Sequence, residues 1–104
     1  MFFQVVAVKD LAVNSFTTPV VVNHVGSAIR EFTSAASNPK SEFYIHAADF
    51  ELFHLGEFDS DTGEVVCFPE GPRRLIRALD VKAGIDINNS LPLSSFPLNS
   101  SSVV

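Results

Sequence analysis

Residues 50–68, FELFHLGEFDSDTGEVVCF, have the pattern of a β-hairpin, and the rest of the chain is arranged around this segment. Alternate positions of its first half carry Phe50, Leu52, His54, Gly56 and Phe58. An extended chain places these five residues on one face, because successive side chains of a strand point to opposite sides. An acidic turn containing a glycine follows, and alternating apolar residues resume after it. The sequence therefore predicts two antiparallel strands joined by a tight turn.

The turn also predicts a register for the hairpin. A three-residue loop at 61–63 uses Gly63 as the left-handed residue that follows a type I turn. This register pairs Phe58 with Val66 and keeps the apolar partners on one face. A shift by one residue pairs Phe58 with Val65, whose side chain belongs to the opposite face, so we predict the first register.

Length and composition indicate a single globular domain. The chain has 104 residues, 46% of them hydrophobic and ten of them Phe, which suffices for a core without disulfides or a metal. A single cysteine, Cys67, excludes an internal disulfide and is typical of a reducing compartment. Because Cys67 falls in a strand pattern, we expect it to be a small buried hydrophobic residue.

The apolar N-terminal segment MFFQVVAVKD is expected to be a strand and not a targeting or membrane segment. It lacks a basic n-region, Gln4 interrupts it, and it is too short to cross a bilayer. We therefore expect no membrane association and a location in the cytoplasm of the cell that makes the protein.

The first third of the chain predicts two strands and a helix. Residues 2–9 are apolar on both faces, as in an interior strand, whereas Pro19 confines a second strand at 16–22 to an edge or a bulge. Asn23 stands where a helix N-cap is needed, and the residue pair Asn38-Pro39 ends the helix near 36 or 37. Apolar residues at steps of three and four form the stripe that would face the sheet: Val25, Ala28, Ile29, Phe32, Ala35 and Ala36.

The rest of the chain predicts a connection, the hairpin, a short helix and a tail. Residues 40–49 form a connection with one helical turn at 46–49. A short helix runs from Pro72 to Gly84, with Leu75, Ile76 and Leu79 at helical spacing. We thus predict one α+β domain at 1–84, in which two β-hairpins (2–22 and 50–68) form a small antiparallel sheet under helix 24–37. Residues 85–104, rich in Ser, Asn and Pro, are expected to be a mobile tail.

No motif in the sequence indicates catalysis, a cofactor or a metal. Asp59, Asp61 and Glu64 surround Gly63, but the glycine has the wrong offset for a calcium loop, and a solvated turn is preferred. The three histidines lack the paired spacing of zinc ligands, and we interpret them as a helix-start, a loop and a strand residue. The serines lack a nucleophile elbow, and a phosphate-binding glycine loop is absent. We expect a protein that is not an enzyme.

Charge points to one segment for anion contacts. The net charge is −5, which opposes non-specific binding to nucleic acid. Residues 1–69 hold three basic residues against nine acidic ones, whereas 70–82 hold four against two. On a helix, Arg73 and Arg77 share a face with Arg74 alongside and Lys82 nearby, as in a small phosphate-binding ridge. The alternative is a solvated helix face that pairs with the acidic body. Candidate aromatic residues for base stacking are Phe2, Phe43 and Tyr44.

Several segments between about residues 4 and 68 resemble one viral family. They are Val8-Lys9-Asp10, Thr18-Pro19, the run VGSAIREF at 25–32, Asn38-Pro39 and, most specifically, LGEFD at 55–59 with Thr62-Gly63. In order and spacing they are similar to the small nonstructural protein of gokushoviruses, single-stranded DNA phages of the Microviridae. Departures are Ala47-Ala48, where Pro-Glu is expected, and the valines at 20–22, where aromatic residues are usual. The tail after residue 84 has no counterpart in the resemblance.

The resemblance implies a non-virion accessory protein that acts in the cytoplasm of an infected bacterium. Such proteins are described as DNA-binding and as helping the switch toward single-stranded genome synthesis and packaging. Arg30 matches a recurrent basic residue of the family, and Lys9 lies in a segment that carries the resemblance. The predicted nucleic-acid-binding residues are therefore Arg73, Arg74, Arg77, Lys82, Arg30 and Lys9.

Two functional hypotheses follow. The first is an accessory protein that binds single-stranded DNA, or a complex of DNA with the replicase, through grouped basic residues. The second is a protein-interaction module that contacts the replication initiator or the procapsid without touching DNA, through the edge strand near Pro19 or the apolar tail. The sequence leaves the oligomeric state open, and a homodimer that shares a sheet edge would be one way to gather the few basic residues.

Overall fold

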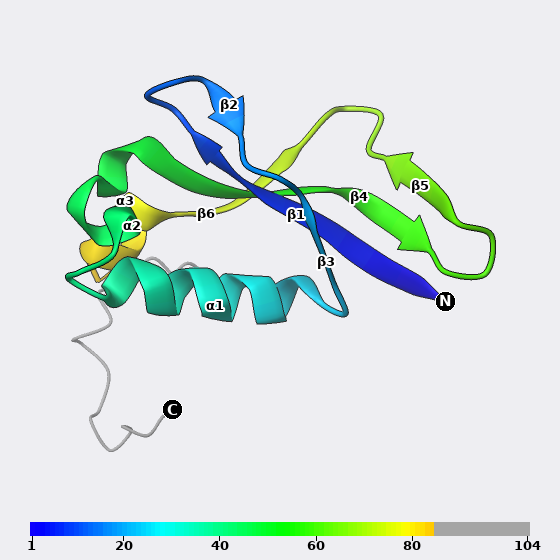
Figure 1. The fold of residues 1–104 in the computed structure, drawn as a ribbon, viewed down its shortest axis with the longest axis horizontal. Coiled ribbons are helices and arrows are strands. Elements are labelled where there is room, and N and C mark those ends of the chain that lie inside the picture. Colours follow the sequence, from blue (N-terminus) through cyan, green and yellow to red (C-terminus); the bar gives the residue numbers. More distant parts are fainter. Residues whose placement is uncertain (85–104) are drawn as a thin grey trace, which may run out of the picture.

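The computed structural model describes residues 1–84, which form a twisted antiparallel sheet with helices packed on one side (Figure 1). The predicted α+β class is confirmed; the predicted tail at 85–104 lies outside the described residues. The strands are β1 (Phe2–Asp10), β2 (Ser15–Phe16), β3 (Val20–Val22), β4 (Phe50–Asp59), β5 (Glu64–Cys67) and β6 (Arg73–Arg77). The helices are α1 (Val25–Ser37), α2 (Glu42–Ile45), the 3-10 turn η1 (Ala47–Asp49) and α3 (Ala78–Lys82).

Two long strands, β1 and β4, form the centre of the sheet. Both β2 and β3 pair with the outer edge of β1, and both β5 and β6 pair with the outer edge of β4. The predicted interior position of the first strand is confirmed. The predicted strand at 16–22 does lie at an edge, but it is interrupted: Thr17 to Pro19 separate β2 from β3, because proline has no N–H to donate to β1.

Helix α1 covers one side of the sheet with the predicted stripe. Ala28, Phe32 and Ala36 are buried, and the helix ends at Ser37, as the Asn38-Pro39 pair predicted. The predicted N-cap is wrong by one residue. His24 occupies the cap position with an extended backbone and makes no side-chain cap bond, so the helix begins at Val25 without the help of Asn23.

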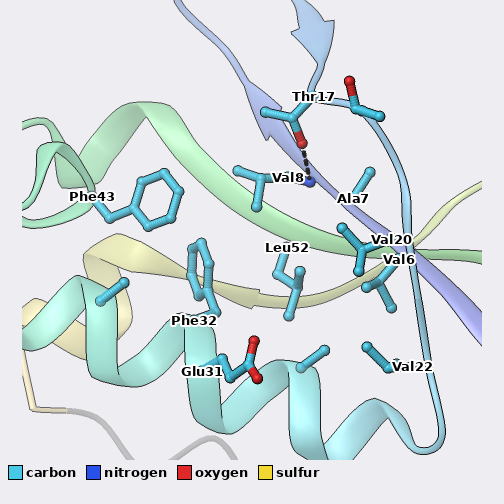
Figure 2. Close-up of a pocket in the computed structure, with 13 residues that line it drawn as sticks. Val6, Ala7, Val8, Thr17, Val20, Val22, Glu31, Phe32, Phe43 and Leu52 are labelled. Atoms are coloured by element: carbon cyan, nitrogen blue, oxygen red, sulfur yellow. Dashed lines mark hydrogen bonds between the residues drawn. The ribbon is translucent and has the colours of Figure 1, made fainter.

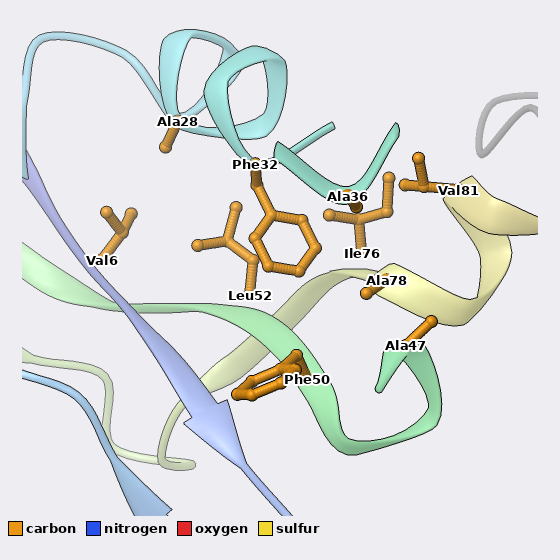
Figure 3. Close-up of a cluster of buried hydrophobic side chains, with 10 residues drawn as sticks. All are labelled: Val6, Ala28, Phe32, Ala36, Ala47, Phe50, Leu52, Ile76, Ala78 and Val81. Carbon is orange, nitrogen blue, oxygen red and sulfur yellow. The ribbon is translucent and has the colours of Figure 1, made fainter. Parts of the chain in front are cut away.

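The hydrophobic core lies between α1, α3 and the sheet (Figure 3). Phe32 lies at the centre of this core and is 4% exposed. Phe43 of α2 packs between the rings of Phe32 and Phe50, and its ring centroid lies 5.2 Å from that of Phe32 and 4.8 Å from that of Phe50. The buried members are Val6, Ala28, Phe32, Ala36, Ala47, Phe50, Leu52, Ile76, Ala78 and Val81.

A β-bulge at Leu55 breaks the alternation that the sequence predicted for β4. Val6 pairs with His54 but Val5 pairs with Gly56, so Leu55 is the extra residue. A bulge shifts the side-chain pattern by one position. His54 therefore shares the side of the sheet that faces α1, whereas Gly56 and Phe58 point to the opposite side. The prediction that all five alternate residues share one face is wrong beyond His54.

The register predicted for the hairpin is also wrong by one residue. Phe58 pairs with Val65, and the loop has four residues, 60–63. Asp59 fixes this turn: its carboxylate accepts a hydrogen bond from the Asp61 amide (2.9 Å), and its carbonyl accepts one from the Gly63 amide (2.7 Å). All residues of β5 are exposed, so burial does not select a register there. The same exposure corrects the prediction of a buried Cys67.

The segment before α3 is a strand and not the predicted helix. Residues Arg73–Arg77 pair with β4 as β6, and only the later part of the predicted helix, Ala78–Lys82, is helical. Leu75 is a second bulge residue, because Leu52 pairs with Ile76 and Phe53 with Arg74. The free backbone along the outer edge of β4 outweighs a local spacing that suited a helix, since propensity is a weak preference. The predicted turn at 46–49 corresponds to η1, whereas α2 was not predicted.

Candidate nucleic-acid interface

The surface of the sheet that points away from α1 is named here the open face. Directly paired residues of neighbouring strands share a side of the sheet, so the registers define its members. Buried residues of α1 and α3 belong to the core cluster on the other side, and Val5 and Ala7, although buried, lie outside that cluster. The open face consists of Phe3, Val5, Ala7, Lys9, Phe16, Val21, Glu51, Phe53, Gly56, Phe58, Val65, Cys67, Arg74 and Arg77.

Aromatic side chains gather on the open face. The rings of Phe16 and Phe53 meet edge to face with centroids 5.4 Å apart, beside Ala7, which pairs with Phe53. A second aromatic pair, Phe3 and Phe58, lies directly across β1 and β4. Phe16 is exposed and the other three rings are half-buried. The open face thus offers ring surface to a planar ligand.

Three of the six predicted basic residues also belong to the open face. Lys9 lies 5.6 Å from the centre of the Phe16 ring. Lys9, Glu51 and Arg77 occupy one row across three strands, and Arg74 pairs with Phe53 in the next row. Two interstrand spacings of about 4.8 Å separate the backbones of Lys9 and Arg77. Strand pairing therefore places Lys9 beside the exposed Phe16 ring and Arg74 beside Phe53, with Arg77 one row further along the same strand as Arg74.

Carboxylates orient Arg74 and Arg77 but engage only some of the N–H groups of each guanidinium. Arg74 Nη1 lies 3.5 Å from Glu51 Oε2. Arg77 donates through Nε and Nη2 to the two oxygens of Asp80, at 3.0 and 2.7 Å. Hydrogen bonds from Arg77 lower the pKa of Asp80, and the same contact raises the pKa of Arg77. An arginine has five N–H donors, so donors remain for phosphate oxygens.

The two sides of the sheet differ in charge. Among strand residues, the open face holds Lys9, Arg74 and Arg77 against the single acid Glu51. The side that faces α1 holds one cation, Arg73, against four acids: Asp10, Glu57, Asp59 and Glu64. The net negative charge of the chain is therefore unevenly distributed, and the aromatic surface carries a local excess of positive charge.

The other predicted basic residues lie elsewhere. Arg73 points to the α1 side, where its guanidinium stacks on the Phe68 ring (3.6 Å to the centroid) and pairs with Glu70. Lys82 lies 4.5 Å from the ring centre of Tyr44, and Arg30 is exposed on α1. The predicted ridge of three neighbouring arginines is thus not formed, because β6 directs Arg73 away from Arg74 and Arg77.

The predicted stacking aromatics do not belong to the interface either. Phe2 is exposed but points to the α1 side, Phe43 is part of the core packing, and Tyr44 lies beneath Lys82. Sequence reasoning missed Phe16 and Phe53. Phe16 pairs with Lys9, and Phe53 pairs with Ala7, which shares a side of β1 with Lys9. Finding them required the correct registers of β1 with β2 and β4.

A polar cluster adjoins Arg73 on the α1 side of the sheet. His54 Nε2 donates to Gln4 Oε1 (2.8 Å), and its ring meets Phe68 edge to face at 4.6 Å. Burial is the main cause that lowers the pKa of His54, followed by the charge of Arg73. This arrangement favours a neutral imidazole.

An open groove of about 290 Å³ lies between α1 and the β1–β3 edge of the sheet (Figure 2). Val6, Val22 and Phe32 form its floor and walls, and Val20 lies 56% exposed at its rim. Thr17 stands at the upper end, where its hydroxyl accepts a hydrogen bond from the Val8 amide at 3.1 Å. Pro19 interrupts the edge strand here, which leaves the groove uncovered among the described residues.

Residues 1–84 contain no group of three or more His, Cys, Asp or Glu side chains that could hold a metal ion. Within the same span, none of the helices is long and apolar enough to cross a membrane.

Fold and surface together define a small α+β protein whose sheet has helices on one side and an aromatic, cationic face on the other. The family described as phage ORF5 protein matches residues 3–81, and the chain belongs to that family. The predicted bacteriophage origin is thereby confirmed, whereas gokushovirus membership and DNA binding stay predictions. No curated protein and no solved structure matches the chain significantly.

Proposed function

We propose that this phage protein binds single-stranded DNA on the open face of its sheet. It acts in the host bacterial cytoplasm as a non-catalytic accessory protein that supports the switch to genome synthesis and packaging. The role in infection rests on the resemblance to gokushovirus nonstructural proteins. The observation that carries the binding proposal is the grouping of Phe16 and Phe53 with Lys9, Arg74 and Arg77.

Aromatic rings and cations on one face are what a single strand requires. Unpaired bases stack on exposed rings, each contributing about 1–3 kcal/mol, while basic side chains contact the phosphates between them. Phe16 and Phe53 supply the rings. All three cations lie on strands next to that of Phe53, and Lys9 also pairs directly with Phe16. The acids of the strands lie mainly on the other side, so the phosphates meet little repulsion.

The test is a titration of a labelled single-stranded oligonucleotide, followed by fluorescence anisotropy at several salt concentrations. The variant Lys9→Gln/Arg74→Gln/Arg77→Gln should bind far more weakly. Each phosphate contact contributes about 0.7 to the slope of log affinity against log salt for single strands, so the slope should fall by about 2. Phe53→Ala should lose about 1–3 kcal/mol of binding with an unchanged slope.

The matched control removes three cations that lie off the open face: Arg30→Gln/Arg73→Gln/Lys82→Gln. Both triple variants have the same net charge. If binding uses the open face, the control keeps most of the affinity of the natural protein. Equal losses in the two variants would mean that total charge, and not this face, determines binding. Absence of binding to the natural protein at low salt would refute the proposal.

The second candidate function is protein interaction without DNA contact, and the groove beside β3 favours it. An apolar side chain of the replication initiator or of a procapsid protein could enter between Phe32 and the rim residue Val20. Val20→Lys should then abolish capture of that partner from infected cells and leave DNA affinity unchanged. Capture that withstands nuclease treatment and depends on Val20 would support this function.

A further inference from the structure

The outer edge of β5 is an unpaired strand edge in the part of the chain that the structure describes. Natural edge strands are usually guarded by charges, proline or bulges, because their free N–H and C=O groups pair with other chains. Among residues 1–84, β5 pairs only with β4, and the last three residues of β5 are apolar and uncharged. Val65 and Val66 are 56% and 49% exposed, and Cys67 is exposed beside them.

Contacts at Gly56 show which backbone groups of β5 face outward. A Cβ placed on Gly56 would lie 2.2 Å from the Val66 carbonyl oxygen, so this carbonyl is directed at β4. Backbone groups of successive residues in a strand alternate in direction. The N–H and C=O groups of Val65 and Cys67 therefore point to the open edge, two residues apart.

We propose that β5 pairs in antiparallel fashion with β5 of a second copy, with the two-fold axis at Val66. Val65 of each copy then lies opposite Cys67 of the other. Because the backbone groups of both residues face outward, the two pairs exchange four N–H···O=C hydrogen bonds.

Other two-fold registers use the edge less well. An axis at Cys67 would place Val65 opposite Pro69, which has no N–H to donate. An axis at Val65 would place Cys67 opposite Gly63, which belongs to the turn with φ 79°. An axis between two residues would pair an outward group with an inward one. Val66 alone allows the whole of β5 to take part.

Self-complementarity identifies the partner as a second copy of the chain. Valine meets valine at the axis, and Val65 meets Cys67 on the open face, so apolar side chains cover one another on both sides of the sheet. Glu64 lies opposite Phe68 and not opposite a second Glu64, which avoids a like-charge pair. The axis is perpendicular to the sheet, so both open faces lie on the same side of the dimer.

The pairing is argued from the edge strand alone and is tested without DNA, so it stands or falls independently of the proposed function. The test is disulfide trapping. In a Cys67→Ser background, Val66→Cys places two thiols at a directly opposed, non-hydrogen-bonded pair, whose Cα separation of about 4.5 Å suits a disulfide. Mild oxidation should give a cross-linked dimer.

Two controls fix the register and the edge. In the natural chain, the two Cys67 residues are diagonal, about 7–8 Å apart, and should cross-link much more slowly. Val21→Cys with Cys67→Ser places a thiol on β3, the opposite edge of the sheet, and should not cross-link. Faster cross-linking through Cys67 or Val21 than through position 66 would overturn the proposal.

Sedimentation of the reduced protein gives a second measurement. Val65→Pro removes an outward N–H and leaves the β4–β5 ladder intact, so it should weaken dimerisation at least tenfold, whereas Val65→Ala, which keeps that N–H, should weaken it less. A natural protein that stays monomeric at every accessible concentration, or a Val65→Pro variant that folds and dimerises normally, would refute the pairing.

Discussion

Replacing Gly56 by alanine tests the close approach of β4 and β5. The added Cβ would lie 2.2 Å from the Val66 oxygen, 2.9 Å from the Cys67 Cα and 3.0 Å from the Val66 carbonyl carbon. All three atoms belong to the backbone, so no side-chain rotation can relieve the clash. To restore an ordinary contact, β5 must move by about 1 Å, which breaks the ladder at this point.

The magnitude is limited by what β5 contributes to the fold. Forced overpacking costs about 1–3 kcal/mol. Detachment of β5 loses a few ladder hydrogen bonds of about 1 kcal/mol each and almost no burial, because all four residues are exposed. We therefore expect Gly56→Ala to lower the free energy of unfolding by about 2–3 kcal/mol.

Urea unfolding measures this change, and hydrogen exchange locates it. The amides of β5 should lose protection while those of α1 keep theirs. Gly26→Ala is the matched control, because a Cβ there meets nothing within 4 Å and alanine is the better helix former; it should stabilise the protein by up to about 1 kcal/mol. A loss below about 0.5 kcal/mol for Gly56→Ala, with β5 still protected, would refute the reasoning.

Two further predictions concern the core and the polar cluster. Phe32→Ala should cost about 3–5 kcal/mol in urea unfolding, because the side chain is at the centre of the core; a loss below about 1 kcal/mol would mean that the core does not depend on this ring. Burial and the charge of Arg73 lower the pKa of His54 in the folded protein below its value of about 6.5 in the unfolded chain. The unfolded chain therefore takes up a proton first, and the free energy of unfolding should decrease as the pH falls below about 6.5. His54→Gln should flatten this dependence between pH 7.5 and 5.5, and an unchanged profile would exclude His54 as its source.

Helix α1 and strand β1 were predictable because their patterns depend on burial. The stripe through Ala28, Phe32 and Ala36 has the period of a helix that packs on a sheet, and each member is buried. Pro19 marked an edge for a covalent reason, the missing N–H, which holds in any fold.

The bulges and the candidate interface were not predictable, for a common physical reason. A bulge residue such as Leu55 or Leu75 has ordinary chemistry, and only the partner strand reveals that it is extra. Each bulge reverses the side to which the following residues point, and the bulge at Leu75 brings Arg74 and Arg77 to the same side of the sheet. Arg73 and Arg74 face opposite sides because successive residues of a strand alternate, and the sequence had placed all three arginines on a helix. The register of β5 against β4 was not predictable either, because Val65 and Val66 are both exposed and burial does not favour one side of the sheet for them.

The unequal charges of the two sides of the sheet give the protein an electric dipole across the sheet. Near a polyanion, this dipole orients the molecule so that Lys9, Arg74 and Arg77 face the polyanion and the acids of the strands face away from it. If the open face binds single-stranded DNA as proposed, molecules arranged side by side on one strand would present their acidic sides to the surrounding solution. Two strands coated in this way would repel each other and remain dispersed.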